Sequence, residues 1–139
     1  MTYGFAPPFL GTVSTSSLLI DAARCWRNAR DAGWPAQPSL AGILREHCAE
    51  MLAPCLDSLM SLSQAALGRP FRVGKGRAIS TDEHLLLDLV AGAKPPPACL
   101  DCPREIATAL DCALCSTRIM ITMEQAESQG GRADDGATA

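Results

Sequence analysis

The sequence lacks a long apolar run and lacks any excess of positive charge. A helix needs about 18 consecutive apolar residues to cross a membrane. No run of that length occurs, so we expect no membrane-spanning segment. The 139 residues include 12 Lys and Arg against 15 Asp and Glu, which gives a formal net charge of −3. Because proteins that work mainly by neutralising phosphates are normally basic, we do not expect a nucleic acid as partner.

The sequence also lacks the pattern of an export signal and of a disulfide framework. A secretory signal needs a basic segment followed by an uninterrupted apolar stretch. The start of this chain has no basic segment, and Pro7 and Pro8 interrupt any apolar helix there. The cysteines number seven, which is odd, and Cys25, Cys48 and Cys55 occupy apolar positions of helical patterns. Reduced thiols in the core of a cytoplasmic protein fit this usage better than disulfides do.

Catalytic motifs are equally scarce. The chain has two histidines and no Gly-Lys-Ser/Thr phosphate-binding motif, and its acidic residues show no periodicity that would point two carboxylates into one site. No strand–helix–strand pattern accompanies the cysteines, so a thioredoxin-like enzyme is not supported. We therefore do not predict an enzyme.

What the sequence does have is helical periodicity. Apolar residues make up 47% of the chain and charged residues 19%, a globular composition, and the apolar residues recur at spacings of three and four. We predict an all-α protein, with a compact domain of four to five helices in an orthogonal or bundle-like arrangement over residues 14–127. Residues 1–13 are expected to form an extended lead, and residues 128–139 a disordered tail.

Glycines, prolines and capping residues set the expected helix boundaries. A first helix is expected to begin near Ser14–Ser17 and to end at Gly33. The longest apolar stripe starts after Ser39, a predicted N-cap, and ends at Leu67. Pro54 lies inside this stripe, so we expect two helices that meet just before it and share one core face.

The next part of the chain is expected to form a loop and a short central helix. Residues 69–79 contain one proline and two glycines and predict a tight, basic loop. Ser80 and Glu83 then form a capping box, in which each side chain bonds the other residue's backbone N–H. The leucine-rich segment up to Gly92 is apolar on most sides and is expected near the centre of the domain. Trp26 and Trp34 are expected to anchor the core.

This middle part of the chain resembles a known group of proteins. A long helix, a basic turn and Thr81-Asp82-Glu83-His84 followed by leucines resemble a family of small uncharacterised proteins from sphingomonad-type alphaproteobacteria, over residues 40–92. The turn of that family often carries clustered cysteines, whereas here it reads Val-Gly-Lys-Gly-Arg-Ala-Ile-Ser. The resemblance implies a helical bacterial protein of the cytoplasm and implies no activity.

Two Cys-x2-Cys pairs, Cys99 with Cys102 and Cys112 with Cys115, form the sharpest candidate site. Four such thiols suggest a zinc site. A straight helix from Pro103 would, however, place Cys112 about 14 Å from its start, whereas zinc holds its sulfurs within about 4 Å of one another. Three alternatives stay open: zinc, unlinked thiols, and a redox-active or disulfide pair at Cys99 and Cys102 beside a helix N-terminus.

A cluster of cations lies just before the capping box. Arg69, Arg72, Lys75 and Arg77 fall within nine residues, and the glycines around Lys75 would let backbone amides approach a phosphate beside a helix N-terminus. These four residues are a candidate anion-binding site. The alternative, which we favour, is a solvated surface loop.

The last predicted helix is apolar on two faces. One face carries Ile106 and Leu110, and the opposite face carries Cys112 and Cys115 beside Ile119 and Met123. A helix of this kind needs cover on both sides, and the other helices supply slightly too little. We therefore predict a homodimer that buries Ile119 and Met123 across a two-fold axis.

Together these patterns predict a small, non-enzymatic helical protein of the cytoplasm. It would act by protein–protein interaction or regulation, with a second copy or another protein as partner and with no cofactor. The alternative is a thiolate-zinc or thiol-redox protein that uses the two C-terminal cysteine pairs.

Overall fold

A computed structural model describes the backbone of residues 13–92 and 102–138 and the side chains of residues 15–92 and 102–124. Within these ranges the chain forms no strand, and Lys75 and Ala78 make a single isolated antiparallel bridge. Five α-helices follow one another: α1 (Val13–Ala32), α2 (Ala36–Leu44), α3 (Ala53–Leu67), α4 (Thr81–Ala91) and α5 (Arg104–Thr138). The predicted all-α fold of four to five helices is confirmed, with five helices in the described residues.

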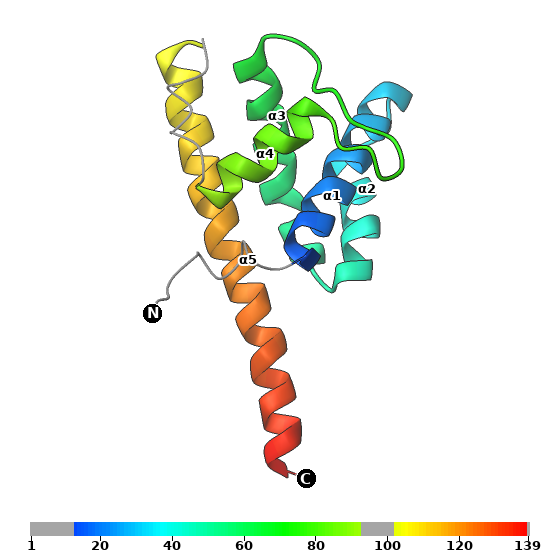
Figure 1. The fold of residues 1–139 in the computed structure, drawn as a ribbon, viewed down its shortest axis with the longest axis vertical. Helices are drawn as coiled ribbons and strands as arrows, with labels where there is room; N and C mark the ends of the chain where they lie inside the picture. Colours follow the sequence, from blue (N-terminus) through cyan, green and yellow to red (C-terminus); the bar gives the residue numbers. More distant parts are fainter. Residues whose placement is uncertain (1–12, 93–101, 139) are drawn as a thin grey trace.

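The helices pack as two pairs joined by a crossing helix (Figure 1). α3 lies along α5, and α1 lies along α2, with further contacts between α2 and α3. α4 crosses the front of the domain in this view and touches both α1 and α5. α5 is much longer than the others, and its C-terminal half extends past the rest of the molecule (Figure 1). The long helix is therefore covered by the domain over only part of its length.

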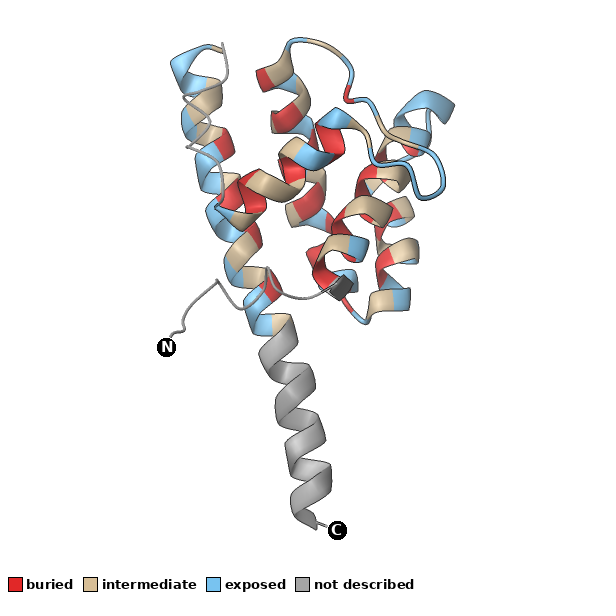
Figure 2. Cartoon of the chain, in the orientation of Figure 1, coloured by how far each residue is buried: buried red, intermediate tan, exposed pale blue. Residues whose placement is uncertain are grey.

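The buried residues lie mainly on the sides of the helices that face one another (Figure 2). Trp26 of α1 is fully buried, and its indole nitrogen Nε1 donates a hydrogen bond to Oδ1 of Asp57 on α3 at 2.9 Å. The rest of the core includes buried leucines from all five helices. Burying each such side chain contributes roughly 1.5–3 kcal/mol, so this apolar core is the main source of stability.

The predicted division of the long apolar stripe is confirmed, and its physical cause is visible. α2 ends at Leu44, two 3₁₀ turns follow, and α3 begins at Ala53 with Pro54 in its first turn, where the missing N–H of proline costs nothing. The predicted N-cap at Ser39 is wrong. α2 already begins at Ala36, and the Ser39 hydroxyl donates to the carbonyl of Pro35 at 2.9 Å.

The capping box before α4 is confirmed. The Ser80 hydroxyl accepts from the backbone N–H of Glu83 at 3.0 Å, and the Glu83 carboxylate accepts from the backbone N–H of Ser80 at 2.9 Å. Gly92 ends α4 in the left-handed conformation, as expected of a helix stop. Leu86, Leu89 and Val90 are buried, so one side of α4 packs into the core. The predicted position at the centre of the domain is only partly right, because α4 crosses the front of the domain and His84 on it is exposed.

Two expectations about the outer segments turn out differently, and a third is not tested. We expected the last helix to end before Ser128, but α5 continues to Thr138, because an existing helix adds one hydrogen bond with each further residue. Trp34 was expected in the core and is 64% exposed, because the left-handed Gly33 turns the chain away from α1. The predicted lead and the segment around Cys99 fall in residues 1–12 and 93–101, outside the described residues.

Candidate functional site

The basic loop is fastened to the domain by an arginine from another helix. Arg24 of α1 donates from Nε to Oε2 of Glu83 at 2.8 Å and from Nη2 to Oε1 at 3.2 Å. The same guanidinium donates to the carbonyl oxygens of Gly76, at 2.7 Å, and Ala78, at 3.0 Å. Glu83 itself is fully buried. Arg24 therefore joins α1, the loop and the N-terminus of α4 through one side chain.

Asp82 makes a second link between the loop and α4. Arg69 binds the Asp82 carboxylate with two nitrogens, at 2.7 and 2.8 Å, and the backbone N–H of Arg72 donates to the same carboxylate at 2.8 Å. Asp82 is buried, whereas the Arg69 side chain is 34% exposed. One of the four candidate anion-binding residues is thus already paired with a carboxylate of its own chain.

Both carboxyl groups are held in the charged form. The Arg69 hydrogen bond lowers the pKa of Asp82, and its effect exceeds that of burial, which acts to raise it. For Glu83, burial is the largest single influence and raises the pKa, but the bonds from Arg24 and from the backbone N–H groups of Ser80 and Gly74 together outweigh it, so the pKa lies below its ordinary value. The N-terminus of α4 is therefore already occupied by negative charge.

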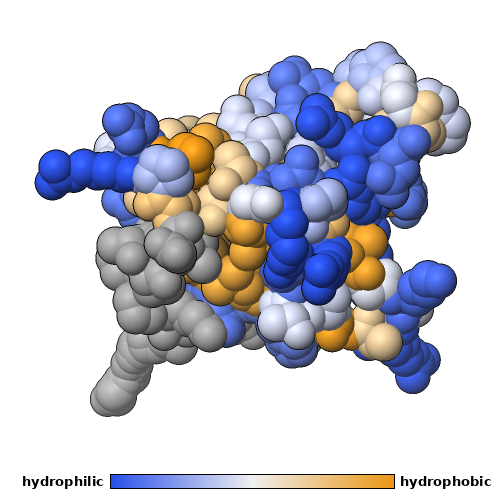
Figure 3. Space-filling model, turned by 90° about the horizontal axis from the view of Figure 1, so that it is seen from above, coloured by the Kyte–Doolittle hydropathy of each residue, from blue (hydrophilic) through white to orange (hydrophobic). Residues whose placement is uncertain are grey.

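The other three cations of the candidate anion site remain at the surface. Arg72, Lys75 and Arg77 are exposed, and the end of the molecule that carries the loop is largely hydrophilic when seen from above (Figure 3). An incoming anion would meet the buried Asp82 and Glu83 at the helix N-terminus that was expected to attract it. The geometry thus favours a solvated loop, whose backbone is held by hydrogen bonds to the side chains of Arg24 and Asp82.

The candidate cysteine site is spread along α5. Cys102 lies before the helix and packs partly against the core, whereas Cys112 and Cys115 are exposed on α5. At 1.5 Å per residue, Cys112 lies about 12 Å along the axis from Arg104, well beyond the separation of two sulfurs on one zinc ion. Among the described residues, no group of three or more His, Cys, Asp or Glu side chains could hold a metal. Cys99 lies outside them.

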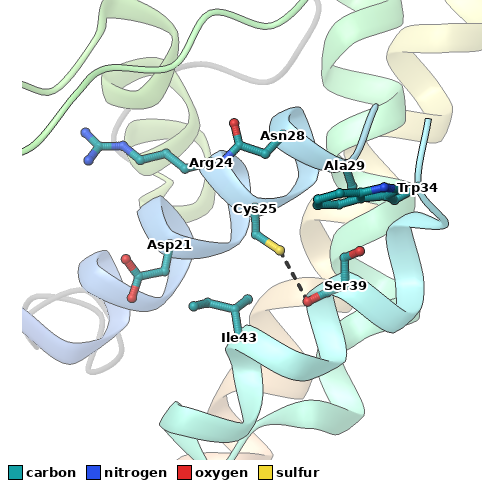
Figure 4. Close-up of a pocket in the computed structure, with 8 residues that line it drawn as sticks. All are labelled: Asp21, Arg24, Cys25, Asn28, Ala29, Trp34, Ser39 and Ile43. Carbon is teal, nitrogen blue, oxygen red and sulfur yellow. Dashed lines mark hydrogen bonds between the residues drawn. The ribbon is translucent and has the colours of Figure 1, made fainter. Parts of the chain in front are cut away.

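A pocket of about 370 Å³ opens between α1 and α2 (Figure 4). Cys25, Ala29, Trp34 and Ile43 give it an apolar wall. Arg24 borders the pocket, but its guanidinium points away from it, toward the basic loop (Figure 4). Sequence analysis did not anticipate this pocket, because it depends on the outward turn of the chain after Gly33.

The thiol in this pocket is not arranged as a nucleophile. Burial raises the pKa of Cys25, and its Sγ donates to the carbonyl of Ser39 at 3.2 Å. The nearby His47 bonds through Nε2 to Oδ2 of Asp21 at 2.9 Å and not to a thiol. A reactive cysteine needs a lowered pKa or a basic neighbour, so the pocket supports small apolar contacts rather than covalent catalysis.

Two stripes with the same spacing run along opposite sides of α5. We call the buried stripe the inner face and the exposed stripe, which lies away from α3, the outer face. The inner face consists of Leu110, Leu114, Thr117 and Ile121, all at most 2% exposed. The outer face consists of Thr108, Cys112, Cys115, Ile119, Thr122 and Met123, all exposed. Ile119 and Met123 are 54% and 58% exposed, so the outer face presents large apolar side chains with no cover from the described part of the chain.

α5 is also apolar enough to raise the question of a membrane. The segment Arg104–Glu124 has the length and composition of a helix that could cross one, and 22% of its most apolar stretch is buried. The same segment is fixed to the domain by Arg118, whose Nε donates to the carbonyl of Val90 at 2.8 Å and whose Nη2 donates to that of Leu89 at 2.5 Å. These bonds satisfy the C-terminal end of α4 and hold α5 against it.

Sequence analysis identified the outer face but missed the two links that hold the basic loop. Arg24 lies beside the apolar stripe of its helix and looks like an ordinary surface cation, and its partner Glu83 is 59 residues away. The capping-box motif predicted the bond of Glu83 to the backbone, but the same motif does not distinguish a buried carboxylate from an exposed one. No signal in the sequence pointed to Asp82.

Comparisons with known proteins found no relative of this chain. No protein-family model matches the chain, and neither a curated protein nor a solved structure does.

Proposed function

We propose that this protein is a non-enzymatic interaction protein that binds a helix of another protein chain along the outer face of α5. The observation that carries the proposal is the exposure of six regularly spaced, uncharged side chains directly opposite the buried inner face. Ile119 and Met123 are the largest of the six, and exposed apolar surface that gathers in one stripe marks interaction sites on soluble proteins.

The spacing of the outer face favours a helix as the ligand. Thr108, Cys112, Cys115, Ile119 and Thr122 follow one another at intervals of four, three, four and three residues. This is the a/d pattern with which two helices pack knobs into holes. An extended peptide or a flat surface would not use a repeat of this period.

The hydroxyl of Thr122 does not oppose such docking. Its Oγ1 donates to the carbonyl of Arg118 on the preceding turn at 2.8 Å. A polar group is costly to bury only when it loses its hydrogen bond, and this bond lies within α5 itself. A ligand helix can therefore cover Thr122 without supplying a partner for it.

A protein ligand fits α5 better than a membrane does. Asp111 and Arg118 lie in the middle of the apolar segment, and a charged side chain at the centre of a bilayer costs about 2.5–3.5 kcal/mol on insertion scales. Insertion would also break the bonds from Arg118 to α4 and expose the inner face. A protein helix covers the outer face and leaves these contacts in place.

We also propose that the protein works in the cytoplasm. All six described cysteines are free, and the thiols of Cys25 and Cys55 take part in hydrogen bonds, with the carbonyl of Ser39 and the hydroxyl of Thr117. Free thiols in structural positions are typical of a reducing compartment.

Photocrosslinking in the cells that express the protein tests the docking surface directly. A benzophenone amino acid is placed at Ile119 in one variant and at Met51, which is 69% exposed on the short turn before α3, in a matched control. We expect a protein adduct from position 119 and none from position 51. The proposal is wrong if position 119 gives lipid adducts only, no adduct, or the same products as position 51.

A further inference from the structure

We infer that the helix bound by the outer face of α5 is α5 of a second copy of this chain, running antiparallel, with Cys112 of each copy opposite Cys115 of the other. This inference rests on the proposed function and names its partner. Three properties of α5 support it: the sizes of the outer-face side chains, the charges on their flanks and the closeness of approach that the residues allow.

The sizes of the side chains fit an antiparallel pair. In such a pair each a position faces a d position of the other helix. With Cys112 opposite Cys115, Thr108 of one copy meets Ile119 of the other. The layers from Thr108 to Ile119 then combine either two cysteines or one threonine with one isoleucine, which keeps the distance between the helices nearly even. At each end of the pair, Thr122 meets the exposed Glu105 of the other copy. A parallel pair would stack Thr108 on Thr108 and Ile119 on Ile119, and the distance would have to change more along the pair.

The flanking charges favour the same direction. Asp111 and Arg118 occupy the same flank of the outer face, each one residue before a seam position. Within the described residues, the Asp111 carboxylate has no hydrogen-bond or ion-pair partner, and Arg118 uses Nε and Nη2 but not Nη1. They lie about 10 Å apart along their own helix, too far to pair. In the antiparallel arrangement Asp111 of each copy comes opposite Arg118 of the other, and such complementarity sets orientation.

The centre of the outer face allows two helices to approach closely. Cys112 and Cys115 are small, and Ser116 beside them is small and exposed as well. Small side chains bring the distance between helix axes toward the lower end of the usual 8–10 Å range. The outer-face residues from Thr108 to Met123 carry no charge, so two copies meet there without repulsion even though each chain has a net charge of −3.

Mixed thiol cross-linking tests both the partner and its direction. In the full chain, Cys48, Cys99 and Cys102 are replaced by serine. One protein then carries Cys112 with Cys115→Ser, and the other carries Cys115 with Cys112→Ser. The half-buried Cys25 and Cys55 stay in place in both. Diamide is the oxidant: two thiols lose their hydrogens and join as a disulfide, and diamide takes up both hydrogens to become a hydrazine. An unchanged helical circular dichroism spectrum confirms that each variant folds.

The antiparallel arrangement predicts that a mixture of the two proteins forms a disulfide-linked dimer at least several times faster than either protein alone. Equal or faster cross-linking within each single protein would indicate a parallel pair and overturn the inference. No cross-linking above that of a variant lacking both cysteines would overturn it as well. If the photocrosslinked adduct at Ile119 contains a different protein, the docking surface stands and the second copy is excluded. If position 119 gives no protein adduct, the proposed function itself fails.

Discussion

The basic loop before α4 and the outer face of α5 differ in the contacts that the rest of the domain makes with them. The loop carries four cations, but the buried carboxylate of Asp82 meets Arg69 from within the domain, and Arg24 of α1 binds the loop's backbone carbonyls. The outer face carries no charge, yet Ile119 and Met123 are exposed in the described part of the chain. The loop is thus fastened by groups of its own domain, whereas the described residues leave the apolar stripe uncovered.

The largest effect is expected where the loop is fastened. Arg24→Ala leaves the fully buried Glu83 carboxylate without its cation, and removing one member of a buried ion pair costs about 3–5 kcal/mol. Urea denaturation measures the change in the free energy of unfolding. Arg45→Ala, which removes an exposed pair with Glu50, is the control and should cost less than about 1 kcal/mol. Equal effects of the two substitutions would show that Arg24 does not fasten the loop to the domain.

Gly74 gives a second way to loosen the loop. A Cβ at this position would collide with the carbonyl oxygen of Ala78 and press on the Glu83 carboxylate. We expect Gly74→Ala to cost about 1–3 kcal/mol, as overpacking does. Gly42→Ala is the matched control, because Gly42 lies in α2 with open space around it, and it should stabilise the protein by about 0.5–1 kcal/mol. Thermal unfolding of both variants should show shifts of opposite sign.

Acid should weaken the same region. The pKa values of Asp82 and Glu83 lie below the ordinary 3.8 and 4.5 in the folded protein, so the unfolded chain binds more protons. Their contribution to stability is complete above those ordinary values and is lost as the pH falls through them toward the folded pKa values. Urea unfolding at a series of pH values should show this decline. In Glu83→Gln the decline should be shallower, and an unchanged slope would contradict the assignment.

The smallest effect is expected from the exposed cations. Replacing Arg72, Lys75 and Arg77 by glutamine should change the free energy of unfolding by less than about 0.5 kcal/mol, because exposed charges contribute little. Addition of phosphate should stabilise the variant and the parent equally. A loss of about 2 kcal/mol, or a phosphate effect confined to the parent, would show that the loop is packed more tightly or binds an anion.

Local sequence signals predicted most of the fold. Glycine stops, the capping box and Pro54 each act within a few residues, so most helix boundaries and the division before α3 follow from the sequence alone. The two faces of α5 also follow, because the repeat is helical and local. The start of α2 did not follow: Ser39 looks like an N-cap, yet its hydroxyl bonds the carbonyl of Pro35.

Contacts between segments far apart in the chain could not be predicted from the sequence. Arg24 meets Glu83 across 59 residues, and Trp26 meets Asp57 across 31. No local pattern encodes such partners, since they depend on how whole helices pack. The pocket between α1 and α2 is of the same kind, because the exposed position of Trp34 follows from the turn at Gly33.

Sedimentation equilibrium at micromolar concentration tests the central claim most directly, which is that the outer face of α5 is covered by a second copy. We expect the protein to sediment with twice the mass of its 14.6 kDa chain. Ile119→Glu should sediment as a folded monomer, because that side chain is exposed in a single copy, whereas Met51→Glu should stay dimeric. A mass of 14.6 kDa for the unchanged protein at every concentration, or a dimer that Ile119→Glu leaves intact, would contradict the account.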